Sequence, residues 1–227
     1  MKTVDPLKSN DLQQFELIMK ATQRQMGFTP NSMKTMARKP AILGAFSALV
    51  ANILGKAGTI SPLQGIQLSI KNLKWTVKNL KDPNRISDEL KQLVAHMSSN
   101  ASGCRYCQAH TLEAAHHAGA SKEKLKTLWE FEQSDQFNEA EKSALRFAVA
   151  AGSVPNQVNA SHFEDLRKHY TEAQIVELGA VVSLFGFLNR WNDTFATQLE
   201  ASPMAFATEI IGEKGWEAGK HQSSSSD

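Results

Sequence analysis

Cysteine is scarce in this sequence, and several common motifs are missing altogether. The only two cysteines among the 227 residues, Cys104 and Cys107, lie together in the stretch SGCRYCQAHT, which excludes a framework of several disulfides. No glycine-rich phosphate loop or dinucleotide-binding fingerprint occurs, so we expect no cofactor. No basic cluster alternates with aromatic residues, and the formal net charge is only +2. These two features argue against nucleic acid as a partner.

Long apolar runs are missing as well. The longest nearly apolar stretches, ILGAFSALVANILG and VELGAVVSLFGFL, are shorter than the roughly 20 residues that span a bilayer. The N-terminal stretch MKTVDPLKSND has no apolar segment of the kind found in a secretory signal. We therefore expect a cytoplasmic protein with no membrane partner. In that compartment a lone CxxC pair is seldom a structural disulfide, because cellular thiols keep it reduced.

Strand patterns are also lacking, and almost every segment has the apolar spacing of a helix. Helix starts are predicted at Ser87, at Asn138 and at Thr171, where the side chain can cap the following backbone N–H groups. Pro40 is predicted to interrupt the helical pattern between residues 31 and 54. The sequence therefore predicts an all-α protein with a single multi-helix domain.

Three parts of the chain are distinguished by this pattern. Residues 1–27 are predicted to form an N-terminal helical extension, 28–200 the helical domain, and 201–227 a C-terminal tail whose end is disordered. Within the domain, residues 63–80 form an amphipathic stretch whose lysines are expected to face solvent. A membrane-surface role for this stretch is the alternative.

The CxxC pair is predicted to begin a helix. The spacing places Cys104 and Cys107 on a stripe of small residues, close enough to form a disulfide after modest adjustment. The unpaired N–H groups at a helix start favour a thiolate at Cys104, and His110 could exchange a proton with Cys107. Two alternatives remain at this point. The cysteines could be inert buried residues, or they could bind zinc. Zinc usually has four ligands, and Cys104, Cys107 and His110 supply at most three. We therefore expect no metal.

Longer segments around this pair resemble a known family, the alkylhydroperoxidase D-like branch of the carboxymuconolactone decarboxylase superfamily. The resemblance covers roughly residues 28–200 and is carried by GFTPNSMKTMARKPAILGAFSAL, by ELKQLVAHMSSNASGCRYCQAHT and by a segment from FNEAEKSALRF that ends in NRWND. It implies an all-helical fold and a homo-oligomer, either a trimer or dimers assembled into a hexamer. It also implies a thiol enzyme that reduces hydroperoxides or disulfides and is restored by an external dithiol reductant.

The resemblance also implies roles for the two thiols. In the family the second cysteine of the motif attacks the substrate and the first resolves the product, so Cys107 would attack and Cys104 would close the disulfide. The family's proton relay does not carry over, because its three positions hold Gln92, Tyr106 and Thr111 in this sequence.

Two histidines are the nearest replacements for that relay. His96 lies one helical turn after Gln92, and His110 is the residue before Thr111. We therefore predict a catalytic set of Cys107, Cys104, His110 and His96, in which Gln92 orients a histidine.

Two other functions remain as alternatives. The first is a decarboxylase-type enzyme that acts on a lactone-like carbon acid, as the superfamily's name suggests; the CxxC pair argues against it. The second is a redox-sensing oligomer without catalytic activity.

Overall fold

The computed structural model describes residues 4–26, 28–29, 31–54 and 62–222, and all of the regular structure within these residues is helical. The predicted all-α class is confirmed. The residues form two compact units, one of residues 86–170 and 178–222 and the other of residues 4–85 and 171–177. This division differs from the boundaries that the sequence predicted after residues 27 and 200.

Capping side chains set several of the helix starts, as predicted. Ser87 Oγ accepts a hydrogen bond from the backbone N–H of Leu90 and begins α5 (Asp88–Ala101). Asn138 and Glu141 form a reciprocal capping box at α8 (Glu139–Gly152). Thr171 Oγ1 accepts from the N–H of Gln174 at the start of α10 (Glu172–Phe195). These predicted starts are confirmed.

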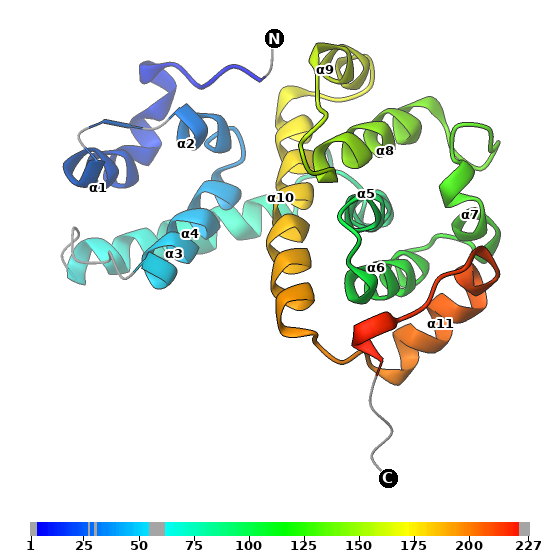
Figure 1. Cartoon of the computed structure of the whole chain (residues 1–227). Coiled ribbons are helices and arrows are strands. Elements are labelled where there is room, and N and C mark those ends of the chain that lie inside the picture. The colour runs from blue at the N-terminus through cyan, green and yellow to red at the C-terminus, as the bar shows by residue number, and fades with distance from the viewer. Residues whose placement is uncertain (1–3, 27, 30, 55–61, 223–227) are drawn as a thin grey trace. The chain divides into compact units, whose positions relative to one another are not determined.

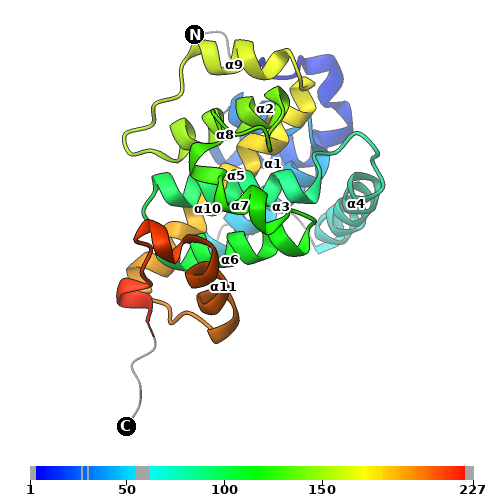
Figure 2. The same ribbon diagram turned by 90° about the vertical axis from the view of Figure 1, so that its right-hand side faces the viewer.

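The unit that holds the CxxC pair is built around α5. This helix lies between α8 and α6 (Arg105–His117), as Figures 1 and 2 show. Its other elements up to residue 195 are α7 (Lys122–Lys126), the short 3-10 helix η3 (Leu128–Glu130), α9 (Ala160–Arg167) and the greater part of α10. Leu93 on α5, Leu112 on α6 and Leu145 on α8 are fully buried. The CxxC helix is thereby fixed against a well-packed core.

The other unit contains the N-terminal helices. Its elements are η1 (Ser9–Phe15), α1 (Glu16–Met26), α2 (Asn31–Met36), α3 (Pro40–Leu54) and α4 (Pro62–Leu80), followed by the first turn and a half of α10. Pro40 is the first residue of α3, so the predicted interruption is confirmed. The core of this unit includes Phe15, whose ring centroid lies 5.3 Å from that of Trp75 on α4.

The chain after residue 200, predicted as a tail, instead continues as ordered structure. Residues Ala201–Ile211 form α11, which packs against α6 (Figure 1), and two short 3-10 helices, η4 (Gly212–Lys214) and η5 (Gly219–His221), follow it. Ile210 and Ile211 are buried, and this burial explains why the segment is ordered. The predicted disorder at the end of the chain concerns residues 223–227, which lie outside the described residues.

Helix α10 contains the apolar stretch VELGAVVSLFGFL that the sequence analysis noted. Of the described helices, it alone has the length and composition that could cross a membrane, a property that core helices of soluble proteins share. Several of its polar side chains are buried. Glu177 forms an ion pair of 2.9 Å with the buried Lys39, and Asn189 and Asn192 are also buried. Such side chains are typical of a helix packed inside a protein.

Candidate active site

A tight turn places the two thiols at the start of α6. Helix α5 ends at Ala101, and Gly103 then adopts the left-handed region with φ 77°, a conformation that glycine enters without strain. The N–H of Cys104 donates to the carbonyl oxygen of Ser99 at 3.1 Å. Cys104 is the N-cap residue of α6, and Cys107 lies in its first turn. The predicted helix start is therefore confirmed.

The two cysteines are free thiols, and both are buried. A hydrogen bond from the Cys107 thiol is the main cause that lowers the pKa of Cys104 from 9.0 to about 7. Burial opposes this shift, and the nearby backbone N–H groups of Cys107 and Tyr106 support it, although neither forms a full capping hydrogen bond to the sulfur. Cys104 is thus the thiol that ionises near neutral pH.

Cys107 is held in the opposite state. Its hydrogen bond to Cys104 is the main cause that raises its pKa, and burial and the charge of the Cys104 thiolate act in the same direction. Asn192 Nδ2 donates to Cys107 Sγ at 3.5 Å. The negative charge of Asp193 raises the pKa of both thiols. The pair therefore shares one proton, which stays on Cys107.

His110 is joined to a carboxylate that the sequence analysis did not predict. Its Nε2 lies 2.7 Å from Glu200 Oε2, and the hydroxyl of Tyr106 donates to Glu200 Oε1 at 3.1 Å. The Tyr106 and His110 rings are in contact, tilted by 35° with centroids 4.4 Å apart. Burial is the main cause that raises the pKa of Tyr106 to about 12, and the charges of Glu200, Cys107 and Cys104 add to it. This cluster of Tyr106, His110 and Glu200 is therefore within electrostatic reach of the thiols.

His96 lies in the core, with no hydrogen bond to either sulfur. Its Nδ1 is 3.0 Å from the carbonyl oxygen of Gln108 and 3.2 Å from Thr111 Oγ1, and its Nε2 has no partner. Burial lowers its pKa to about 4, so the ring is neutral at physiological pH. Gln92, which is half-buried on α5, is not among the hydrogen-bond partners of His96. Neither His96 nor Gln92 is among the groups that shift the pKa of Cys104 or Cys107.

A small pocket of about 210 Å³ lies in the same unit as the thiols. Its lining comes from the ends of α5 and α8 and from α10, and includes Ser98, Gly152, Asn189, Arg190 and Asp193. Asp193, whose charge acts on both thiols, is also paired with Lys220 Nζ at 2.9 Å. The lining of the pocket includes neither cysteine, and Asp193 is its link to the thiol pair.

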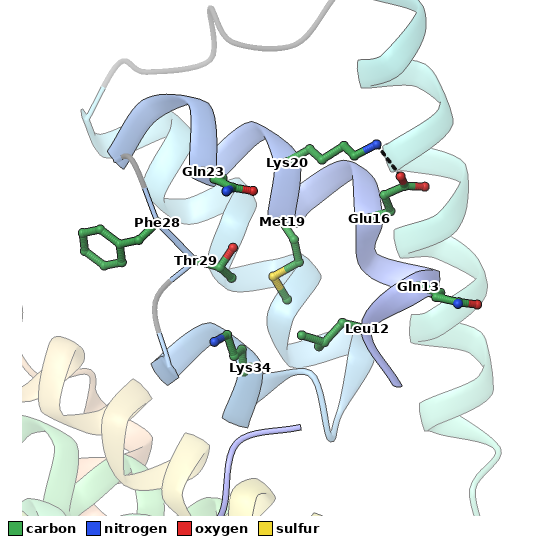
Figure 3. A pocket seen from close by; sticks show the side chains of 9 residues that line it. All are labelled: Leu12, Gln13, Glu16, Met19, Lys20, Gln23, Phe28, Thr29 and Lys34. Atoms are coloured by element: carbon green, nitrogen blue, oxygen red, sulfur yellow. Dashed lines mark ion pairs between the residues drawn. The ribbon is translucent and has the colours of Figure 1, made fainter. Parts of the chain in front are cut away.

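A larger hollow, of about 890 Å³, lies in the other unit and is shown in Figure 3. Leu12, Met19 and Phe28 contribute its apolar part, and Lys20 is paired there with Glu16. Its lining includes no cysteine or histidine, so it offers none of the predicted chemistry. Among the described residues, no group of three or more His, Cys, Asp or Glu side chains is arranged to hold a metal ion.

A profile of the carboxymuconolactone decarboxylase family matches residues 69–150. The debrominase Bmp8, whose crystal structure is known, has 31% sequence identity with this chain. The match covers 92% of this chain and 98% of the Bmp8 chain, and the two structures superimpose with a TM-score of 0.56. The chain belongs to the carboxymuconolactone decarboxylase family. The superfamily expected from the sequence is thereby confirmed.

Two further solved structures are similar to this chain. One is Bmp8 with a cysteine replaced by alanine, in complex with 2,3,4-tribromopyrrole; it is 31% identical over 92% of this chain and 98% of its own, with a TM-score of 0.55. The other is the alkylhydroperoxidase AhpD core of a peroxidase-related protein from Ralstonia eutropha, 20% identical over 86% of this chain and 91% of its own, with a TM-score of 0.45. The comparison with curated proteins gives no match.

Three side chains of this site were not predicted from the sequence: Asn192, Asp193 and Glu200. Asn192 and Asp193 belong to the NRWND segment, which was noted for its resemblance and could have indicated them. Glu200 is 90 residues from its partner His110 and has no motif around it. Only the packing of α11 against α6 brings it to the site.

Proposed function

We propose that the protein is a thiol-dependent oxidoreductase in which Cys104 and Cys107 together supply two electrons to a substrate. The observation that carries the proposal is the pair of free, buried thiols at the start of α6, where Cys104 is the N-cap residue and Asn192 donates a hydrogen bond to Cys107. The lowered pKa of Cys104, caused mainly by its hydrogen bond with Cys107, supports a thiolate at that position. A thiolate is the nucleophilic form of cysteine, and a neighbouring thiol can then displace the product as a disulfide forms. An external dithiol restores the pair.

The proposed roles reverse those that the family resemblance implies. Cys104 has the lower pKa and the backbone N–H groups of the helix start, so we assign the attack to Cys104. Cys107 keeps its proton and forms a hydrogen bond with Asn192, so we assign it the resolving step. The hydrogen bond from the Cys107 thiol is the main physical reason for this reversal, and the backbone N–H groups at the helix start add to it.

His110 remains the proposed proton donor to the departing group. Glu200 gives the ring a carboxylate partner, whose hydrogen bond fixes the orientation of the ring. Burial raises the pKa of Glu200, but hydrogen bonds from its own backbone, His110 and Tyr106 outweigh burial and lower it. Glu200 is therefore an anion at neutral pH, as this role requires.

The substrate class that we place first is a halogenated aromatic compound. The support is the 31% identity with the debrominase Bmp8, which extends over nearly all of both chains. In this reaction the Cys104 thiolate attacks bromine, the carbon–bromine bond breaks, and the carbon takes up a proton. The Cys107 thiol then displaces bromide from Cys104, so that one carbon–bromine bond is reduced for each disulfide formed. Hydroperoxides, followed by disulfides, are the second class, because the same pair would reduce an O–O bond through a sulfenate on Cys104.

Substrate-dependent oxidation of the pair tests this proposal. The reduced protein is mixed, without any other reductant, with 2,3,4-tribromopyrrole, with cumene hydroperoxide or with a small disulfide. We expect one bromide released for each pair of thiols lost, and an intact protein mass lower by two hydrogens. Thiol loss with the peroxide alone would favour the second substrate class. Unchanged thiols with all three compounds would contradict the proposed function.

A further inference from the structure

Two side chains that line the small pocket near the thiols carry buried polar atoms with no hydrogen-bond partner in the part of the chain that the structure describes. Asn189 on α10 is 4% exposed, and both its Oδ1 and its Nδ2 are unpaired. Ser98 on α5 is fully buried, and its Oγ is unpaired. A buried polar group without a partner costs folding free energy, so these two residues do not serve the stability of the fold. They indicate a ligand that pairs with them.

Both side chains are held on rigid parts of the unit. A Cβ at Gly152 would lie only 2.6 Å from the carbonyl oxygen of Ser98, so the end of α8 is packed directly against this part of α5. Asn189 shares the buried face of α10 with Val182, which also lines the pocket, and with Asn192. The polar groups of the pocket are therefore fixed in position before a ligand arrives, which lowers the cost of binding.

The size of the pocket fits one substituted ring. A cavity of about 150 Å³ can hold benzene, and sites for larger, drug-sized ligands measure roughly 300–1,000 Å³. At about 210 Å³, the pocket has room for a single ring with its substituents, but not for a long-chain hydroperoxide. Val154 and Val182 add apolar surface to the lining, which suits the faces of such a ring.

The pocket lies close to the thiol pair, although neither cysteine lines it. Asn189 is three residues before Asn192, whose Nδ2 donates to Cys107 Sγ. This step is about 4.5 Å along the helix axis, a distance that one ring spans. Ser102, which also lines the pocket, is two residues before Cys104. A ring bound at Asn189 can therefore direct its far end towards the thiols.

The unpaired atoms select the polar group of the ring. A hydroxyl group both donates and accepts hydrogen bonds, so it can accept from Asn189 Nδ2 while it donates to Asn189 Oδ1 or to Ser98 Oγ. The N–H of a pyrrole ring only donates, so it would leave Nδ2 unpaired. A carboxylate only accepts, so it would leave Oδ1 unpaired. A neutral phenol therefore satisfies more of these atoms than either of the other groups.

We propose that this pocket binds the hydroxyl-bearing end of a single-ring halogenated phenol, with the halogen directed along α10 towards the thiol pair. The inference rests on the proposed function and narrows its first substrate class from halogenated aromatic compounds to halogenated phenols. Asn189 is the specificity-determining residue, because a ring without the hydroxyl group leaves its amide buried and unpaired.

A binding experiment without chemistry tests the pocket. The protein with Cys104→Ser and Cys107→Ser has no thiol to react, and it is titrated with 4-bromophenol or with 4-bromotoluene while the NMR signals of the ligand are followed. The second compound has a methyl group of similar size in place of the hydroxyl. We expect 4-bromophenol to bind at least about 10-fold more tightly, although it is the less apolar compound. Equal or tighter binding of 4-bromotoluene, or binding of neither compound because the pocket holds only water, would overturn the proposal.

Asn189→Leu in the same background tests the residue that sets the preference. We expect this variant to lose the preference for 4-bromophenol and to keep or raise its melting temperature, because it removes two unpaired polar atoms from the interior. Ser183→Ala, which changes an exposed polar residue of the same helix, is the matched control and should keep the preference. A preserved preference in Asn189→Leu, or a clear fall in its melting temperature, would contradict the role assigned to Asn189.

The pocket and the proposed function can fail separately. If a halogenated aromatic compound oxidises the thiols of the unmodified protein but the binding experiment shows no preference for the phenol, the proposed function stands and the assignment of the pocket is wrong. If 4-bromophenol binds as expected but no compound oxidises the thiols, the pocket is a phenol site and the proposed function is wrong.

Discussion

Replacing Cys104 with serine is expected to abolish reduction of the substrate, both in a single turnover and in steady state, by at least about 10³-fold. The reason is that Cys104 supplies the thiolate, since its pKa of about 7 leaves a large anionic fraction at neutral pH. Cys107→Ser should also stop steady-state turnover, because no disulfide can form. The Cys107→Ser variant should still carry out the first step, the attack of Cys104 on the substrate, because the serine hydroxyl can still donate a hydrogen bond to the Cys104 sulfur.

The two variants are distinguished by the modification that each one traps. With a hydroperoxide, Cys107→Ser should accumulate a sulfenate on Cys104, which peptide mass spectrometry detects after trapping with dimedone. Cys104→Ser should show no such adduct. The reverse result, with a sulfenate on Cys107, would restore the roles implied by the family resemblance and contradict the assignment made from the helix start.

Replacing His110 with alanine is expected to lower turnover by roughly 10²-fold or more, the usual scale for loss of a general acid. Glu200→Gln should lower turnover less, because the amide oxygen can still accept a hydrogen bond from the ring and hold it in place. Turnover is measured with saturating reductant, so that chemistry limits the rate. His117→Ala, which removes an exposed histidine from the same helix, is the matched control.

The pH dependence separates a proton donor from a structural residue. If His110 and Glu200 act together, the pH–rate profile of Glu200→Gln should differ from that of the unmodified protein, because the variant removes the negative charge that faces the histidine ring. Equal turnover of His110→Ala and the unmodified protein at every pH would remove His110 from the site.

The parts of the fold that could be predicted from the sequence are those set by local interactions. Ser87, Asn138 and Thr171 begin helices because their side chains reach N–H groups only two or three residues away. The CxxC pair was placed correctly at a helix start because the turn SSNASG directly precedes it. These features depend on short stretches of sequence that can be interpreted one at a time.

The remainder of the site depends on contacts between distant segments. Glu200 reaches His110 only through the packing of α11, a helix that the sequence analysis treated as a tail. His96 was predicted as an acid–base residue from its position near Gln92, but its ring is turned into the core, towards Gln108 and Thr111. Helical spacing indicates which residues share a face, but it does not reveal which helix will cover that face.

The most direct test of the account is the pH dependence of alkylation at each cysteine. The reduced protein is treated briefly with iodoacetamide at a series of pH values, and the two sites are quantified by peptide mass spectrometry. We predict modification of Cys104 first, with a rate that rises with pH and has its midpoint near 7, because only the thiolate reacts and its pKa is lowered from 9.0. Preferential modification of Cys107, or a midpoint for Cys104 near 9, would contradict the claim that Cys104 is the attacking thiol.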